Sequence, residues 1–414
     1  MGVNITQLRS NINRVGVFAP ILLIIAILWI YPIADIKDPR FSAYFRFETV
    51  AVILFCSVLW QINKWWAAFL LLAFFSSIVP FSTKFSTEAF RAVFIGCLWY
   101  YMITQIPKEK IKYLLDAICI LALCNIAMLI CQYFGFDPIF KPRHIIYGTP
   151  TVGFLSNKNE ASAFLAFCLP AFFRNKWRRL TPLVFLGLTI ASSTGGALAA
   201  VIATIVFWLL RDGREAFIKN WIKLIALLVW FLFFLGYFDP VPIKLFDTSQ
   251  IIQLSEDGKT KIAITAPSYS RFEVWSKGLN LYKQHWIFGS GLGHWKVVFM
   301  PIKINGLWFK WAHNEFVQGV FELGIFFVIL CAGYLFSITN KVRSSILLYN
   351  KKNIIIPTVA MVAICLNSLV NFPFHIAQTA ILAITWMAVF EVQNKKSVIS
   401  QERSINEHQA REVL

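Results

Sequence analysis

Hydrophobic residues along the chain gather in long runs that are separated by charged or turn-forming residues. A helical run of about 20 apolar residues matches the thickness of a bilayer. Counting such runs predicts about twelve membrane-spanning helices, so the expected fold is an all-α polytopic membrane protein. The predicted spans are residues 15–33, 48–62, 65–80, 89–106, 111–134, 160–173, 180–191, 195–210, 221–238, 315–338, 354–370 and 376–392.

The same pattern divides the chain into four parts. Residues 1–238 are predicted to be N-terminal transmembrane helices and residues 314–392 C-terminal ones. Between them, residues 239–313 form a long loop, and residues 393–414 form a short polar tail that we expect to be disordered. The short runs on either side of SSTGG (Ser192–Gly196) are either two helices or one broken segment.

Composition supports the membrane assignment. Hydrophobic residues make up 58% of the 414 residues and charged residues only 14%, well above the apolar share of a soluble protein. The first apolar run, Val15–Ile33, has span length and lacks a small-residue cleavage site, so we expect no cleavable signal peptide. The eight cysteines lie in predicted spans without a CxxC pair, which indicates packing residues and no disulfide or zinc site.

The net charge of +18 does not indicate a nucleic-acid partner, because most of the cations flank apolar runs. Clusters such as Arg174–Arg179 and Lys108–Lys112 fall on one side of the membrane if the N-terminus is cytoplasmic. The positive-inside rule then predicts that both termini are cytoplasmic and that the loop 239–313 is on the outer, periplasmic side. Chemistry on external substrates is expected in that loop.

An amphipathic helix is predicted inside the loop, in PSYSRFEVWSKGLNLYKQHW. Ser270 and Glu273 have the spacing of a capping box, which favours a helix start. An apolar stripe follows at steps of three and four, which predicts that the helix lies on the outer membrane surface. Arg271 stands in the first turn, where a cation is unfavourable, so it either binds an anion or extends toward the headgroups. The stripe comprises Phe272, Trp275, Leu279, Tyr282 and Trp286.

His313 and Asn314 open the tenth predicted span, and Glu315, Gln318 and Glu322 recur on one face of it. Polar groups on one stripe of a span are expected to face the bundle interior. A lone histidine is more often structural than catalytic. Here it coincides with an aqueous mouth, a helix N-terminus that attracts anions and a nearby arginine, so we predict a functional role for His313.

Other polar residues are predicted on the outer side as well. Lys141, Arg143, Lys158 and Asn159 lie in an outward loop, where they bind either lipid headgroups or substrate. His375, in NFPFH, is either a further polar contact or a packing residue. The glycines of IFGSGLGHW indicate a tight turn rather than a phosphate loop, because no strand precedes them. The sequence has no DxD pair, HExxH motif or Cys/His cluster, so we expect neither metal nor cofactor.

Several segments resemble the O-antigen ligases and O-antigen polymerases of bacterial surface-polysaccharide assembly. The resemblance covers most of the chain from about residue 150 onward. Before that point it extends only to hydropathy. The matching segments are GFLSNKNEASAFLAFCLP (Gly153–Pro170), RFEVWSKGL (Arg271–Leu279), IFGSGLGHW, AHNEFVQGVFELGI (Ala312–Ile325) and NFPFH (Asn371–His375).

The resemblance implies a metal-independent glycosyltransferase of the bacterial inner membrane that takes glycan from undecaprenyl diphosphate at the periplasmic face. By matching position, Arg271 would bind the diphosphate, His313 would orient or deprotonate the acceptor hydroxyl, and Asn314 would support it. The family often has an arginine in the SSTGG junction, where this chain has Thr194. That phosphate contact is therefore either absent or supplied by Arg143 or Lys158.

Several functions remain open at this stage. A ligase would pass glycan to a lipid A-core acceptor, whereas a polymerase would extend a lipid-linked glycan. Nothing in the residues separates these two. A protein O-oligosaccharyltransferase is disfavoured by the short tail. A polytopic transporter is disfavoured because the chain has no two related halves and its polar groups gather at one face, and a structural scaffold would not account for His313 and the outward cations.

Overall fold

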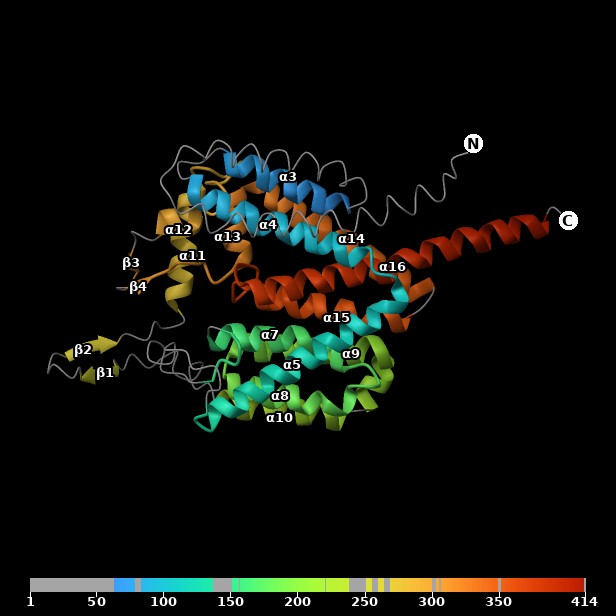
Figure 1. The fold of residues 1–414 in the computed structure, drawn as a ribbon, viewed down its shortest axis with the longest axis horizontal. Helices are drawn as coiled ribbons and strands as arrows, with labels where there is room; N and C mark the ends of the chain where they lie inside the picture. The colour runs from blue at the N-terminus through green and yellow to red at the C-terminus, as the bar shows by residue number, and fades with distance from the viewer. Residues whose placement is uncertain are drawn as a thin grey trace, which may run out of the picture.

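The computed structural model describes residues 63–78, 83–136, 151–155, 157–219, 221–237, 251–254, 260–263, 269–299, 303–304, 307–348 and 351–412. Within these residues the protein is a bundle of long helices with small elements gathered at one end (Figure 1). The spans predicted at residues 15–33 and 48–62 lie outside the described part.

Most of the predicted apolar runs that lie within the described residues coincide with a helix, and these helices follow in the predicted order. Two pairs of short antiparallel strands, β1 with β2 and β3 with β4, lie within the predicted loop and were not expected from the sequence. The helices are α3 (Lys64–Ile78), α4 (Thr83–Thr104), α5 (Ile111–Tyr133), α7 (Lys158–Phe172), α8 (Thr181–Ala191), α9 (Thr194–Lys219), α10 (Trp221–Tyr237), α11 (Tyr269–Tyr282), α12 (His294–Phe299), α13 (Glu315–Leu323), α14 (Ile325–Leu348), α15 (Lys351–Ser368) and α16 (Ala377–Glu412). Short 3-10 helices are η2 (Lys108–Lys110), η3 (Arg178–Leu180) and η5 (Pro373–His375), and the strands are β1 (Ile251–Leu254), β2 (Thr260–Ala263), β3 (Lys303–Ile304) and β4 (Leu307–Trp308).

Helix α7 is the centre of the bundle. From Glu160 to Phe172 all of its residues except Phe164 are buried, because α5, α8, α9, α15 and α16 surround it. Such a helix is expected to be apolar on every side, and its sequence EASAFLAFCLPAF is apolar except for Glu160 and Ser162, which are buried near its start. Its start is fixed by Asn157, whose side-chain oxygen accepts a hydrogen bond from the backbone N–H of Glu160 at 3.0 Å.

Small residues set the close approach of neighbouring helices. A Cβ on Gly196, in α9, would overlap Ser162 of α7, and one on Gly187, in α8, would lie 2.8 Å from Ile126 of α5. Close backbone approach of this kind is the usual basis of helix association in membranes, where apolar burial between helices gains little. The glycines therefore determine the helix spacing around α7.

Three helical segments among the described residues are long and apolar enough to cross a membrane. They are Lys108–Tyr133, Thr194–Arg211 and Ile325–Ser344, and shorter apolar helices lie at Lys64–Ser77, Trp221–Phe233 and Ile354–Ser368. The protein is thus helical and suited to a membrane. The full count of about twelve spans stays a prediction.

The span predicted at residues 315–338 is wrong as a single helix. Helix α13 ends at Leu323, and α14 begins at Ile325 after Gly324, which has φ +69° and ψ −157°. The left-handed φ is favourable only for glycine. The break also brings the turn that contains Gly289 against the end of α13, since the backbone N–H of Ile325 donates to the carbonyl of Trp286 at 2.9 Å.

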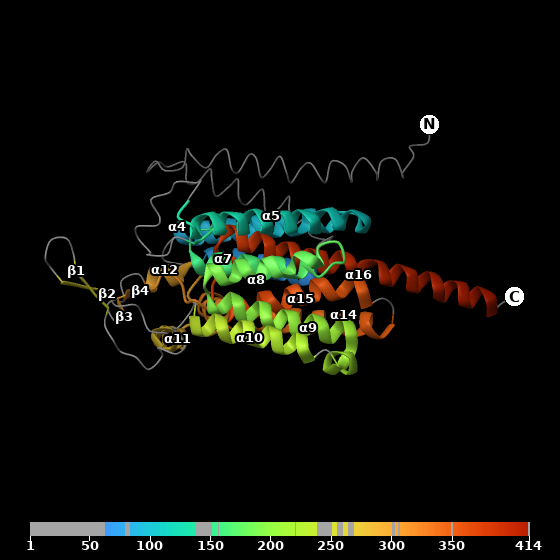
Figure 2. The same cartoon turned by 90° about the horizontal axis from the view of Figure 1, so that it is seen from below.

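The structure also differs from the sequence predictions at the C-terminal tail, and it decides between the two alternatives for the SSTGG segment. The tail after residue 392 was expected to be disordered, but α16 continues as a helix to Glu412, and its C-terminal part extends beyond the bundle (Figures 1 and 2). At SSTGG the chain forms two helices. Ser192 takes a left-handed conformation with φ 53° after α8, and α9 then runs from Thr194 to Lys219 with a kink at Gly213, where φ is 76° and ψ is 171°. The part before the kink corresponds to the predicted span 195–210.

The helix directions separate two ends of the bundle. At one end, Asp116 of α5 accepts from Arg174 and Lys176, which follow α7. At the other end, Gln132, near the last turn of α5, holds the backbone of Gly153, just before α7. Helices α11, α12 and α13 lie at this second end, opposite the extension of α16 (Figure 1).

Helix α11 packs against α12 and α13 and forms a small second core. Val274, Trp295, Phe299 and Phe321 are buried in it, with Phe299 stacked on Trp295 at 4.0 Å between ring centroids. The predicted membrane-facing stripe is therefore divided. Trp275 and Tyr282 pack onto this core, whereas Phe272, Leu279 and Trp286 are exposed. The helix begins at Tyr269, so Ser270 lies inside its first turn rather than at the predicted cap.

The break at Gly324 yields a stability prediction. Gly324→Ala places a Cβ into the carbonyl of Ile287 and also strains the left-handed backbone, so it should destabilise the protein by roughly 3 kcal/mol or more. Gly135→Ala is the matched control, because Gly135 has φ +82° but no atom of the described residues lies within 4 Å of the added Cβ. It should cost only about 1 kcal/mol. Thermal unfolding of detergent-solubilised protein measures both, and equal losses would contradict the steric argument.

Candidate functional site

His313 lies in an unusual backbone turn just before α13. Its φ is 55°, a left-handed conformation that residues other than glycine seldom adopt. Its ring is packed edge-on against Phe372 at 4.7 Å and Phe309 at 6.4 Å between ring centroids. The Nδ1 atom is buried and has no hydrogen-bond partner among the described residues. Strained residues with an unpaired polar atom are typical of functional sites.

Burial, followed by the nearby charge of Arg271, lowers the pKa of His313 to about 3. The sequence analysis attributed catalysis to a histidine, for which a pKa near neutrality is most suitable. In the structure without ligand the imidazole is instead held neutral at physiological pH. A neutral imidazole can accept a proton, but its basicity increases only when an anion approaches.

Arg271 and His313 come together, as the sequence analysis expected. The guanidinium of Arg271 donates through an Nη atom to the carbonyl of Val370 at 3.0 Å, and it lies close enough to His313 to affect its pKa. The hydrogen bond joins α11 to the segment after α15. It explains why an arginine is retained in the first turn of α11, where the helix dipole disfavours a cation.

The residues next to His313 are fixed on both sides. The indole N–H of Trp275 donates to the carbonyl of Ala312 at 2.7 Å, and the N–H of Ala312 donates to the side-chain oxygen of Gln318 at 3.2 Å. Asn314 caps α13, since its side-chain oxygen accepts from the N–H groups of Phe316 and Val317. That oxygen therefore has a structural partner, and a substrate contact for Asn314 stays a prediction.

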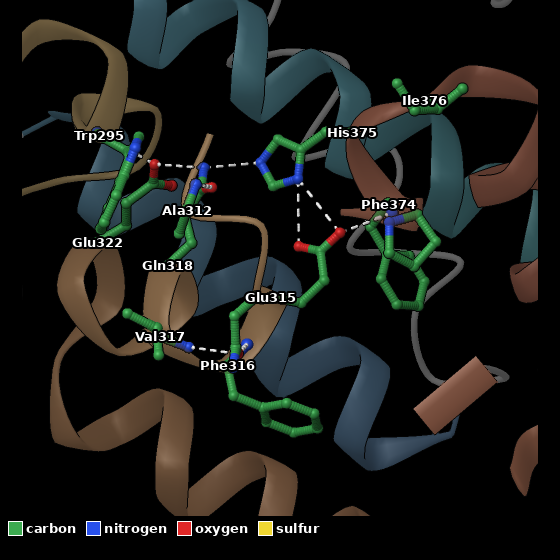
Figure 3. Close-up of polar contacts among 12 residues, drawn as sticks. Trp295, Ala312, Glu315, Phe316, Val317, Gln318, Glu322, Phe374, His375 and Ile376 are labelled. Carbon is green, nitrogen blue, oxygen red and sulfur yellow. Dashed lines mark hydrogen bonds and ion pairs between the residues drawn. The ribbon is translucent and has the colours of Figure 1, made fainter. Parts of the chain in front are cut away.

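A chain of polar contacts runs along α13 (Figure 3). The carboxylate of Glu315 pairs with Nδ1 of His375 at 3.1 Å and accepts from the N–H of Phe374 at 2.8 Å. The amide nitrogen of Gln318 lies 2.8 Å from Nε2 of His375 and 3.1 Å from Glu322. The predicted stripe of Glu315, Gln318 and Glu322 thus faces the interior, as expected.

Glu322 and His375 both contact Gln318, and the pKa of each is raised. Burial raises the pKa of Glu322, although the N–H groups of Gly293 and Trp295 donate to its carboxylate and oppose the shift. For His375, burial favours the neutral form, but the carboxylates of Glu315 and Glu322 outweigh it and raise the pKa above its usual value. His375 is therefore the more basic of the two histidines.

The glycine turn IFGSGLGHW supplies donors to Glu322 and contacts the end of α13. Gly289, Gly291 and Gly293 all have positive φ, and a Cβ at Gly289 would overlap the backbone of Glu322. The N–H groups of Ser290 and Gly291 donate to the carbonyls of Phe321 and Glu322. The predicted tight turn is confirmed. Close backbone contact requires glycine at two of its positions, Gly289 against α13 and Gly293 against Phe85 of α4.

An aromatic and basic cluster next to His313 was not recognised from the sequence. Lys296 lies 4.2 Å from the ring centroid of Trp311, and His375 lies 4.2 Å from the same ring between centroids. Burial, followed by the charge of Lys310, lowers the pKa of Lys296. The signal that was available is position: Trp311 stands two residues before His313, and Lys296 follows the glycine turn.

The predicted outward loop reaches the same end of the bundle. Asn159, in the first turn of α7, accepts through Oδ1 from Ser193 at 2.7 Å, and its carbonyl accepts from the amide of Asn371 at 3.5 Å. Asn159 and Arg271 thus contact neighbouring residues of one segment, and Lys158 stands next to Asn159. Lys141 and Arg143 lie outside the described residues, so their substrate contacts stay predictions.

No three His, Cys, Asp or Glu side chains of the described residues gather in an arrangement that would hold a metal ion. The independence from metal that the resemblance implies stays a prediction.

The low pKa of His313 yields a prediction for stability against pH. As the pH falls from 7 to 5, the unfolded chain takes up a proton near pH 6.5, while folded His313, with its pKa of about 3, does not. His313 therefore lowers the free energy of unfolding by up to about 2 kcal/mol over this range. His313→Phe should remove this loss. The opposite contribution of His375 is common to both proteins and cancels in the comparison. Detergent-solubilised proteins unfolded at both pH values give the difference, and parallel pH curves would contradict a neutral His313.

Comparison with known families gives one match. The sequence model of the family described as O-antigen ligase matches residues 180–332. The match runs from the end of η3 into α14 and includes Arg271, the glycine turn, His313 and α13, while His375 and Asn159 lie outside it. Comparison with curated proteins found no match. The matched region contains the strained histidine and the nearby arginine, and over these residues the chain is similar to the O-antigen ligase family.

Proposed function

We propose that the protein is an O-antigen ligase-type glycosyltransferase, which moves glycan from undecaprenyl diphosphate to a hydroxyl group of a lipid A-core acceptor. The family match supports a membrane glycosyltransferase of the ligase or polymerase type in general. The observation that carries the proposal is that Arg271 and His313 both contact the segment after α15, Arg271 at the carbonyl of Val370 and His313 at the ring of Phe372.

The proposed reaction needs only two side chains at the reacting atoms. The acceptor hydroxyl attacks the anomeric carbon, and its proton passes to the neutral imidazole of His313 as the new carbon–oxygen bond forms. The bond from the anomeric carbon to the diphosphate breaks, and Arg271 stabilises the charge that develops on this leaving group. We expect one displacement with inversion and no covalent enzyme intermediate.

The depressed pKa of His313 is compatible with this role once donor is bound. A diphosphate next to the ring favours the imidazolium, so donor binding raises the pKa of His313 toward neutrality. The base is then weak in the empty site and stronger when the donor is present. The buried Nδ1 atom of His313 has no hydrogen-bond partner among the described residues, so the ring retains a polar atom that can bind the substrate.

The arrangement of the bundle supports a site on the periplasmic side. Arg174 and Lys176 lie at the end of the bundle that is opposite to Arg271 and His313, and the positive-inside rule favours a cytoplasmic location for such clusters. Both termini are then cytoplasmic and the loop 239–313 is periplasmic. Because the site lies at the helix ends and away from the bundle centre, a transporter with a midplane site is less well supported.

A second reading, an O-antigen polymerase that extends lipid-linked glycan, uses the same site and the same chemistry. A protein O-oligosaccharyltransferase would differ in its acceptor alone. The two leading readings are separated by the product that accumulates when the gene is lost. A ligase mutant should accumulate long lipid-linked chains, whereas a polymerase mutant should still attach a single repeat unit to its core. Polysaccharide extracted from a deletion strain and separated by gel electrophoresis distinguishes the two patterns, and the single-unit pattern would replace the ligase proposal.

The proposed roles also predict the effect of substitutions. His313→Ala and Arg271→Ala should each abolish transfer in vitro from a lipid-linked glycan to lipid A-core, a loss of at least about 100-fold, without lowering membrane abundance. Lys277→Ala is the matched control on α11, because it removes an exposed cation that pairs with Glu273 at 3.4 Å across one helix turn. It should retain activity, as should Lys351→Ala at the far end of the bundle. Normal activity in the His313 variant would remove its catalytic assignment.

A further inference from the structure

The left-handed turn at His313 must be held by its neighbours. A non-glycine residue with φ 55° costs on the order of 1 kcal/mol relative to ordinary conformations. Two hydrogen bonds fix the peptide groups of Ala312, one from the indole of Trp275 and one to the side chain of Gln318. Gln318 is the only one of these partners that also connects to the polar chain along α13 among the described residues.

The direction of the Gln318 amide is determined by its partners. Its oxygen accepts from the N–H of Ala312, and its nitrogen donates to the carboxylate of Glu322. A flipped amide would place oxygen against this carboxylate and nitrogen against a backbone donor, so both contacts would be lost. Gln318 is buried, and an unsatisfied buried amide would cost about 1–3 kcal/mol. The observed direction is therefore strongly preferred.

The fixed amide in turn determines the tautomer of His375. Because the Gln318 nitrogen is a donor, Nε2 accepts when His375 is neutral, and the ring proton then stands on Nδ1. Nδ1 then donates to Glu315, whose carboxylate lies 3.1 Å away and also holds the N–H of Phe374. Nε2 is thus occupied, which leaves His375 poorly placed to act as the base itself. Its place in the structure is behind Gln318.

We propose that Gln318, held in one orientation by Glu322 and His375, is the positioning residue that keeps His313 in its left-handed turn with its ring directed to the substrate. This proposal rests on the proposed function, because it assigns Gln318 a role in transfer through His313. Gln318 and His375 touch no reacting atom. They act by restricting the backbone at Ala312, and displacement of a catalytic group by about 1 Å can reduce turnover by about 100-fold.

The first test is the kinetics of Gln318→Met, which keeps the length of the side chain and removes both hydrogen-bonding groups. With undecaprenyl diphosphate-linked glycan as donor and purified lipid A-core as acceptor, kcat should fall at least about 10-fold. The KM for the donor should change less than about two-fold, because Arg271 keeps its bond to Val370. A rise in KM with unchanged kcat would overturn the positioning role.

The second test needs no substrate. Diethyl pyrocarbonate modifies accessible neutral imidazoles, and mass spectrometry follows the rate at each histidine. Gln318→Met should raise the rate at His313 several-fold, while exposed His285 serves as an internal reference whose rate stays constant. His375→Phe should raise the rate at His313 as well. In the double variant that combines Gln318→Met with His375→Phe, the modification rate of His313 should be little higher than in either single variant, because both substitutions act through one amide.

Thr385→Val controls for the general loss of a buried hydrogen bond. Thr385 is 3% exposed and accepts from the indole N–H of Trp99 at 2.8 Å, between α16 and α4. This variant should lower the unfolding temperature in detergent but leave kcat and the His313 modification rate unchanged. If Gln318→Met leaves the modification rate at His313 unchanged, the positioning proposal fails. If wild-type protein transfers no glycan while that rate still rises, the proposed function fails and the control of the turn by Gln318 stands.

Discussion

A carboxylate buried among helices must be surrounded by donors, and the site depends on how Glu322 meets this requirement. Two of its partners are backbone N–H groups of the glycine turn, from Gly293 and Trp295, and the third is the amide of Gln318. The turn must approach α13 closely to supply them, which is why it has glycine with positive φ at position 289, while Gly293 is required by the close approach of the turn to Phe85 of α4. Through Gln318 the same carboxylate is connected to the turn that carries His313.

Sequence periodicity was sufficient to predict the helices and the polar face of α13. Apolar runs report burial or lipid contact directly, so α5 and α8 lie within one or two residues of their predicted bounds. The division of residues 315–338 was missed, because the apolar pattern continues through Gly324 and only the backbone conformation breaks the helix. The inward packing of Trp275 and Tyr282 was missed for a related reason, since an apolar stripe does not distinguish a membrane surface from a protein surface.

The sequence predicted which residues belong to the candidate site better than it predicted how they contact one another. Arg271 and His313 were identified by their unusual places at helix starts, and the structure brings them together. Distant pairs such as Arg271 with Val370, or Glu315 with His375, depend on how separate helices meet, and a single sequence carries no local signal for them. The low pKa of His313 could not be predicted from the sequence either, because it depends on the rings of Phe309 and Phe372, which exclude water from the imidazole.

Four helices begin close together at the end of the bundle that holds Arg271. Ser193, just before α9, is bonded to Asn159 of α7, while Glu315 at the start of α13 holds Phe374, shortly before α16. The bond from Asn371 to Asn159 connects the two pairs. Each helix start contributes about half a positive charge from its peptide groups, so their electrostatic potentials add where a diphosphate would be received. Such backbone charge neither titrates nor disappears on side-chain replacement, so the positive potential of these four helix starts does not depend on the side chain of Thr194.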